Sequence, residues 1–501
     1  MANTDTARTD KTSAPDLPAP SDEVRITRHT LRTPDGELAY TATAGRVVVR
    51  EEKHTDGAFD GYRPAIEMFV VSYTVDGVDP ATRPVTFAFN GGPGSSSVWL
   101  HLGLLGPRRV LAGDAGAPVA PPYRIVENAE SLLAHSDLVF IDPVSTGYSR
   151  PVVGGKPADY HGYTADRDAM AEMIRLWTTR HHRWLSPKFL AGESYGTLRA
   201  AALAARLSER IGMTLNGLML VSTVLDMGSI RFTDGNDAVY PGFLPTYAAY
   251  AHYHGLHGDR SLDEVVQQAR ELAERDYPWA LARGSRLSPA ERTDVVERVA
   301  AVTGLRPEYV DRANLRIEHQ RFFAELLRDR GVTVGRLDGR FTGPAADRNA
   351  DAARKDVSYL AFQTPYTAAV NHYLQAELGY ESDLPYEILS DRVQPWSYAE
   401  FEGRGVTVIP DLDAALRANP FLQVHVSLGW FDGATPFAAA ENGFARMDLP
   451  DELRENISYS YYEAGHMMYL HEQSRVRQSR DLADFVRRSV PQRQEPPAAE
   501  A

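Results

Sequence analysis

The sequence predicts an α/β fold with a mostly parallel central sheet. Residues 137–141 read DLVFI, and such a short, nearly continuous apolar run is typical of a strand buried on both faces of a parallel sheet. From this run to residue 221, segments of strand and helix character alternate. The third observation is a G-x-S-x-G pentapeptide at residues 192–196, where an apolar run gives way to an Ala- and Leu-rich stretch.

The N-terminal part is predicted to contribute a tail and the first strands. Residues 1–22 are rich in Ala, Asp, Thr and Pro and have neither a basic nor an apolar leader-like region, so we expect a disordered tail. A hairpin is predicted over residues 31–49, with its turn at Pro34-Asp35-Gly36. Further strands are expected at residues 68–73 and 85–89.

The central part of the chain carries the predicted strand-to-helix junction. Residues 166–177 have helical spacing of their apolar side chains. The apolar segment 188–191 leads directly into the pentapeptide, and the next strand is predicted at residues 216–221. This order places the serine of the pentapeptide at the end of a buried strand.

Residues 228–355 are predicted to form a helical cap inserted into this domain. Ser261 and Glu264 form a capping box, and Ser288-Pro289 starts a second helix. A third helix is predicted from Pro307 to near Gly331. The charged turn at residues 335–340 is interpreted as structural rather than as a substrate contact.

After the insertion, strands are predicted at residues 422–429 and 457–462. The candidate site residues span from Ser194 to His466, so one catalytic domain must close across most of the chain. We therefore expect that domain to comprise residues 23–227 and 356–488. Residues 489–501 are predicted to be a disordered tail.

The G-x-S-x-G pentapeptide predicts a nucleophile, Ser194, on a sharp strand-to-helix turn. A serine needs a general base and an acid that orients the base, in the chain order Ser, Asp, His for this type of turn. Asp432 directly follows the strand 422–429, and His466 follows the strand 457–462. Each alone could be an ordinary loop residue, but their order and their positions at strand ends favour a triad.

The loop after strand 85–89 predicts an oxyanion hole. It reads Asn90-Gly91-Gly92-Pro93-Gly94, and glycines allow backbone N–H groups to approach a developing negative charge. One donor is expected from this loop and one from Tyr195, the residue after the nucleophile. A phosphate-binding loop is disfavoured, because the G-K-[ST] ending is missing.

Four motifs together resemble the serine carboxypeptidase family, peptidase family S10, over residues 60–480. The motifs are N-G-G-P-G at 90–94, D-P-V-S-T-G-Y-S at 142–149, G-E-S-Y-G at 192–196 and G-H-M at 465–467. The resemblance implies an α/β-hydrolase fold with a helical cap insertion and the release of C-terminal residues from peptides.

The resemblance also assigns roles to individual residues. It implies a triad of Ser194, Asp432 and His466, and it implies that Met467 lines the pocket of the leaving residue. It implies that the N–H groups of Gly92 and Tyr195 form the oxyanion hole. It also implies that the terminal carboxylate of the substrate is bound by Asn90, the Gly91 N–H and Glu193.

Glu193 must be protonated to serve a substrate carboxylate. An ionised side chain would repel the substrate, whereas a neutral carboxylic acid can donate a hydrogen bond, and burial can raise its pKa enough to keep it neutral. Eukaryotic members usually have an acidic residue where this chain has Leu104, so Glu193 is expected to lack a carboxyl partner and an acidic pH optimum is not predicted. Ser95 stands where many relatives have cysteine, and Trp430 occupies a commonly acidic position.

Composition limits the remaining possibilities. The formal net charge of −14 argues against a nucleic-acid partner, and no long apolar run predicts a membrane span. Cysteine is absent from all 501 residues, which is compatible with a reducing compartment, and we expect a cytoplasmic protein. No metal or other cofactor is expected, and the predicted partner is a peptide or small acyl substrate.

Two other functions remain open at this stage. An acyltransferase or an esterase would use the same triad on a small-molecule substrate. A binding protein on a hydrolase scaffold is disfavoured, because no member of the predicted triad is missing.

Overall fold

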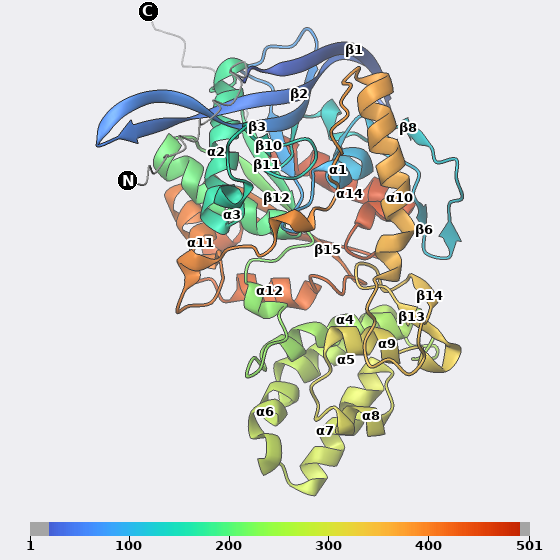
Figure 1. The fold of residues 1–501 in the computed structure, drawn as a ribbon. Helices are drawn as coiled ribbons and strands as arrows, with labels where there is room; N and C mark the ends of the chain where they lie inside the picture. The colour runs from blue at the N-terminus through green and yellow to red at the C-terminus, as the bar shows by residue number, and fades with distance from the viewer. Residues whose placement is uncertain (1–19, 491–501) are drawn as a thin grey trace, which may run out of the picture.

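A computed structural model of the chain describes residues 20–490. The predicted tails, residues 1–22 and 489–501, lie outside this range except for residues 20–22 and 489–490. Within the described range, the architecture is a large twisted sheet with helices on both faces and a helical cap beyond one end of the strands (Figure 1).

The central sheet of the described residues has ten strands in the order β1-β2-β3-β9-β4-β11-β12-β15-β16, with the short β10 paired to β3. The pairings β1–β2, β2–β3 and β3–β9 are antiparallel, whereas every pairing from β9 to β16 is parallel. The predicted mostly parallel sheet is therefore confirmed. The strands are β1 Glu23–Thr33, β2 Gly36–Thr55, β3 Ala58–Val75, β4 Val85–Phe89, β9 Asp137–Ile141, β10 Arg150–Pro151, β11 Lys188–Glu193, β12 Gly217–Val221, β15 Gln423–Gly429 and β16 Ile457–Tyr462.

The antiparallel N-terminal strands are longer than the sequence predicted. The hairpin between β1 and β2 turns at Pro34 and Asp35, as expected, and it continues along the whole of β1. A second hairpin joins β2 to β3 through Asp56 and Gly57, both with positive φ. Its exposed tip projects from the sheet (Figure 1).

Alternation along the strands creates two cores, one on each face of the sheet. In β9, for example, Val139 and Ile141 pack into one core, and Leu138 and Phe140 into the other. The helices α2 Tyr163–Arg180, α3 Tyr195–Arg206, α11 Ile409–Ala418 and α12 Phe437–Ala445 cover the first face. The helices α10 Val357–His372 and α14 Glu472–Arg488 cover the second.

Six helices form the cap below the sheet in Figure 1. They are α4 Val239–Tyr253, α5 Leu262–Glu274, α6 Asp276–Arg283, α7 Pro289–Thr303, α8 Pro307–Arg312 and α9 His319–Glu325. Both predicted helix starts are confirmed, because Ser261 and Ser288 each form a complete capping box. The prediction of one continuous third helix from Pro307 to near Gly331 was wrong. Helix α8 ends at Arg312, because Asn314 and Leu315 take φ values of 52° and 64°, which do not occur within an α-helix.

A short hairpin connects the cap to the sheet. Its strands, β13 Val332–Val334 and β14 Thr342–Pro344, enclose the turn at residues 335–340, and Asp356 then caps the start of α10. The remaining strands and α-helices of the described residues are β5 Arg108–Val110, β6 Gly113–Asp114, β7 Ala117–Pro118, β8 Ile125–Glu127, α1 Val98–Leu100 and α13 Asp451–Arg454. In the part of the chain that the structure describes, no helix has the length and apolarity needed to cross a membrane.

Candidate active site

The serine of the pentapeptide lies on a strained turn between β11 and α3. Ser194 has φ 61° and ψ −128°, a conformation that costs energy for a residue with a side chain. The flanking glycines make the turn possible: a Cβ on Gly192 would collide with the Gly196 carbonyl, and one on Gly196 would lie 2.8 Å from the Phe89 oxygen. The turn leaves Ser194 partly accessible among otherwise buried neighbours, as a nucleophile requires.

The structure brings His466 and Asp432 into contact. The His466 Nδ1 and Asp432 Oδ2 atoms are 2.8 Å apart, and both side chains are buried. Asp432 also accepts hydrogen bonds from the N–H groups of Ala434 and Thr435 and from the Thr435 hydroxyl. These donors hold the carboxylate in the orientation that receives the imidazole.

The charge of this pair favours a protonated His466. Burial by itself lowers the pKa of the imidazole, but attraction to the Asp432 carboxylate and the hydrogen bond to it outweigh burial, so the pKa is raised above its ordinary value of 6.5. An imidazole with these properties is suited to accept and return a proton.

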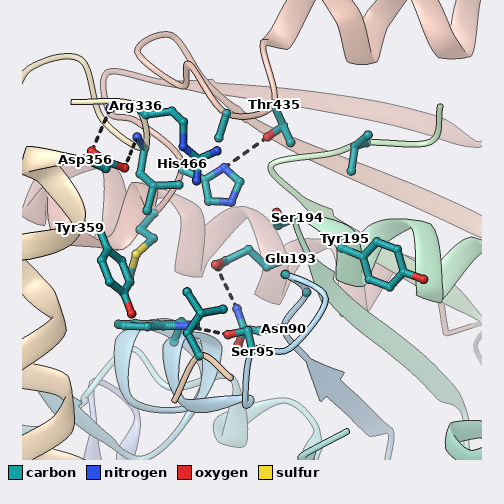
Figure 2. A pocket seen from close by; sticks show the side chains of 18 of the residues that line it. Asn90, Ser95, Glu193, Ser194, Tyr195, Arg336, Asp356, Tyr359, Thr435 and His466 are labelled. Carbon is teal, nitrogen blue, oxygen red and sulfur yellow. Dashed lines mark hydrogen bonds between the residues drawn. The ribbon is translucent and has the colours of Figure 1, made fainter. Parts of the chain in front are cut away.

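Ser194 and His466 line the same cavity (Figure 2). No direct hydrogen bond joins their side chains in the structure, and such bonds are often long before substrate arrives. The predicted triad residues thus meet at one cavity, and the hydrogen bond between Asp432 and His466 is already formed.

The loop after β4 packs against the N–H groups at the start of α3. A Cβ on Gly91 would collide with the Tyr195 nitrogen and would lie 2.6 Å from that of Gly196, so only glycine permits this approach. Gly92, with φ 103°, and Tyr195 both line the cavity beside Ser194. The two predicted oxyanion donors are therefore brought to one place.

A buried arginine that the sequence analysis missed anchors this loop. Arg199 on α3 donates to the Asn90 carbonyl over 2.5 Å and pairs with Asp166 of α2 over 2.7 Å. Arg199 stands five residues after Ser194, where an arginine is not unusual in a predicted helix. The sequence alone therefore gives no sign of this role.

Glu193 is buried beside the candidate nucleophile Ser194 and accepts hydrogen bonds from two side chains. The Asn90 side-chain nitrogen lies 2.9 Å from its Oε1, and the Tyr469 hydroxyl lies 2.8 Å from its Oε2. Burial is the main cause that raises the pKa of Glu193 to about 7, and these donors and His466 partly oppose it. The carboxyl group is therefore largely neutral under mildly acidic conditions.

Tyr469 explains how the site is built without an acid at position 104. Leu104 is buried in the core, whereas the ring of Tyr469 lies directly against Gly103, where a Cβ would collide with it. Glu193 thus has a phenol partner rather than a carboxyl partner. The sequence places Tyr469 three residues after His466 but gives no sign that it reaches Glu193.

The other two differences from the usual family sequence, at Ser95 and Trp430, also have structural explanations. The Ser95 hydroxyl accepts a hydrogen bond from the Trp99 indole over 2.8 Å and so orients a wall of the cavity. Trp430 stacks on Tyr461 and packs edge-on against Phe437, away from the cavity lining.

The cavity has a volume of about 310 Å³ and is lined by both polar and apolar side chains. Tyr195 lines it near Ser194, and Met467 follows His466 in the lining, as the sequence predicted. The turn at residues 335–340, interpreted from the sequence as structural, also contributes Arg336 and Leu337 to the lining. The apolar lining consists mainly of Trp99, Val224, Ile230, Tyr359, Phe362 and Leu389.

The model of the family described as serine carboxypeptidase matches residues 63–468. The chain belongs to the serine carboxypeptidase family. This match covers both ends of the predicted triad and the whole cap.

Curated relatives are similar over shorter stretches. Serine carboxypeptidase-like 33 of Arabidopsis thaliana is 29% identical over 140 residues, which cover 26% of this chain and 26% of that protein. The pheromone-processing carboxypeptidase KEX1 of Yarrowia lipolytica is 29% identical over 147 residues, 29% of this chain and 22% of that protein. The chain therefore spans about a quarter of the length of the curated relatives it matches.

Solved structures are similar at lower identity. A proline iminopeptidase of Mycobacterium smegmatis is 14% identical, with 92% of this chain and 98% of that chain covered and a TM-score of 0.32. A lipase in its open form is 16% identical, with 89% and 99% covered and a TM-score of 0.35. The α/β-hydrolase fold of the present chain rests on its strand order and on the family match.

Proposed function

We propose that the protein is a serine-type carboxypeptidase that releases C-terminal residues from peptides through an acyl-enzyme. The observation that carries this proposal is Glu193, a buried carboxyl group with a pKa of about 7 directly beside the nucleophile Ser194. A general esterase has no need of such a group, whereas an enzyme that binds a free terminal carboxylate does.

The first half of the reaction forms the acyl-enzyme. The Ser194 oxygen attacks the last peptide carbonyl carbon while its proton passes to His466 Nε2, and Asp432 stabilises the resulting imidazolium. The tetrahedral oxyanion accepts hydrogen bonds from the N–H groups of Gly92 and Tyr195. The C–N bond then breaks, and His466 gives its proton to the departing amine.

The second half consumes water. His466 removes a proton from a water molecule that attacks the Ser194 ester, and the same oxyanion donors stabilise the second tetrahedral intermediate. Collapse returns the proton to Ser194 and releases the shortened peptide. Each half therefore uses His466 once as a base and once as an acid.

The terminal carboxylate of the substrate is proposed to bind at Glu193, Asn90 and the Gly91 N–H. Neutral Glu193 can donate its own proton to that carboxylate while Tyr469 still donates to its other oxygen. The Asn90 amide nitrogen gives one hydrogen to Glu193 and retains a second for the substrate.

The test compares blocked dipeptides with their C-terminal amides, using wild type and Ser194→Ala from pH 4 to 8. We expect the free acids to be cleaved at least about 100-fold faster than the amides, and the alanine variant to lose about 10⁴-fold or more in kcat with unchanged folding. Equal cleavage of acids and amides, or hydrolysis of simple esters alone, would favour the esterase or acyltransferase alternative.

A further inference from the structure

Arg336 is a cation in the active-site cavity that has no anionic partner among the described residues. It lies in the turn between β13 and β14, is half-buried and lines the cavity. Its guanidinium group forms no ion pair or hydrogen bond with the part of the chain that the structure describes. Arg340, four residues later in the same turn, is paired with both Asp338 and Asp114.

The acidic side chain next to Arg336 is Asp356, and it forms no ion pair with the guanidinium group. The two carboxylate oxygens of Asp356 accept from the backbone N–H groups of Arg336, Leu337 and Ser358 and from the Ser358 hydroxyl. Asp356 therefore fixes the backbone of the turn and thereby the place from which the Arg336 side chain starts (Figure 2).

The charge of Arg336 opposes the protonation of two histidines, neither of which can supply a negative charge. One is His466. The other is His319 of the cap, where burial and then the Arg336 charge lower the pKa to about 4. Glu193, the remaining acid of the cavity, is largely neutral below its pKa of about 7. Arg336 thus supplies the cavity with a guanidinium group that is available to pair with an anion of the substrate.

The position of Arg336 is on the side of the departing residue. Figure 2 shows Arg336 next to His466, at the end of the cavity away from Asn90. His466 gives its proton to the departing amine, so the departing residue must lie beside it. With the terminal carboxylate held at Glu193 and Asn90, the side chain of that residue would face the part of the lining beside His466, which includes Met467 and Arg336.

We propose that Arg336 is a specificity-determining residue that selects an acidic side chain, Glu or Asp, on the departing C-terminal residue. This inference rests on the proposed carboxypeptidase function. The planar guanidinium group can bind a carboxylate through two parallel hydrogen bonds, which a point charge such as an ammonium group cannot match. The terminal carboxylate is the other possible anion, but Asn90 and Glu193 already provide its site at the opposite end.

The experiment uses blocked dipeptides that share one acyl residue and end in Glu, Gln, Leu or Lys. For wild type we expect kcat/KM for Glu to exceed that for the isosteric Gln by about 10-fold or more. Arg336→Gln should abolish this ratio and leave the Leu substrate within about threefold, and Arg336→Lys should restore part of the ratio. Arg392→Gln, which removes an exposed arginine paired with Glu387, is the matched control and should keep the wild-type ratio.

Two results would overturn the inference. One is a wild-type enzyme that does not distinguish Glu from Gln. The other is an Arg336→Gln variant that loses activity equally on all four substrates, since this would mean that Arg336 binds the terminal carboxylate or positions His466.

Binding to the inactive Ser194→Ala protein separates this inference from the proposed function. Calorimetric titration with the Glu and Gln dipeptides measures the same ratio without turnover. A preference for Glu that disappears in Ser194→Ala/Arg336→Gln would support the role of Arg336 even if wild type cleaved neither peptide. Failure of the proposed function would instead appear as absent cleavage of all free acids.

Discussion

At the scale of a single residue, we expect the protonation state of Glu193 to control activity on substrates with a free carboxylate. Its pKa of about 7 means that it loses its proton within the range in which His466 must be neutral to act as a base. On substrates with a free carboxylate, kcat/KM should therefore fall as the pH rises through about 7, because ionised Glu193 repels the substrate. On amides or esters this fall should be absent.

Replacing Glu193 by Gln tests this assignment in a pH–rate profile. Glutamine keeps a hydrogen-bond donor and does not titrate, so we expect the alkaline fall on free acids to disappear, while the rise that follows deprotonation of His466 remains. Glu308→Gln, on the exposed surface of the cap, should reproduce the wild-type profile. A variant Glu193→Gln that keeps the alkaline fall would assign it to another group.

The same pKa makes a prediction about stability. Because the folded-state pKa lies above the ordinary 4.5, the fold retains the proton more tightly than the unfolded chain does. This contribution is fully present below about pH 4.5 and is lost as the pH rises through about 7. Urea unfolding should show wild type losing about 2 to 3 kcal/mol relative to Glu193→Gln between pH 4.5 and 8. A pH-independent difference between the two proteins would contradict this cause.

A substitution at Gly91 tests the contact between the loop of the predicted oxyanion hole and the turn at Ser194. An added methyl group would lie 2.6 Å from the Gly196 nitrogen, so the loop must move away from the Tyr195 N–H. For Gly91→Ala we expect kcat to fall about 10²- to 10³-fold with a smaller change in KM. Gly405→Ala, at a position with open space for a Cβ, should leave kinetics unchanged. Normal kcat in Gly91→Ala would show that the loop contributes no donor.

At the scale of elements, the turn at residues 335–340 holds the two loops that carry Asp432 and His466 of the candidate triad. The Leu337 carbonyl accepts from the His466 N–H over 2.6 Å, and the Arg336 carbonyl accepts from the Gly433 N–H over 3.0 Å. The Asp338 carboxylate also accepts from the Gly465 N–H over 3.1 Å. This turn therefore fixes the backbone on both sides of the Asp432–His466 contact.

Asp338 is accordingly predicted to be a positioning residue. Asp338→Asn weakens the buried pair with Arg340, and we expect a loss of about 3 kcal/mol in the free energy of unfolding and a lower kcat with little change in KM. Asp329→Asn makes the same change in an exposed pair with Arg306 and should cost less than about 1 kcal/mol. Equal effects of the two variants on kcat would remove the positioning role.

The elements differ in how well the sequence predicts them, for physical reasons. The strands 85–89 and 137–141 were predicted to the residue, because an apolar run of that length between polar segments has few alternatives. The third cap helix was wrong, because the break at Asn314 and Leu315 depends on backbone conformation that no proline or glycine marks. The candidate triad was recognised from strand ends, whereas Tyr469, Arg199 and Arg336 reach the site through tertiary packing that leaves no local pattern.

At the scale of the whole molecule, cap and catalytic domain share one hydrophobic core. The cluster on the first face of the sheet continues from α3 and α12 into the cap helices α4, α5 and α7 without interruption. Tyr250 of α4 lies at this junction, fully buried, with its hydroxyl 3.1 Å from the Gly335 carbonyl and its ring against Gly339. The cap is therefore joined to the turn that holds His466.

This continuity predicts that cap and sheet unfold together, although chains of this length often unfold in steps. Hydrogen exchange of α7 in the cap and β12 in the sheet should report the same opening free energy. Tyr250→Ala should separate the two by removing about 3 to 5 kcal/mol at the junction, so that α7 opens first. Val299→Ala, inside α7, should destabilise the protein without separating the two transitions, since it leaves the junction intact. Separate transitions in wild type would mean that the cap unfolds as an independent unit. The only structural link between the cap and His466 in this argument would then be the turn at residues 335–340.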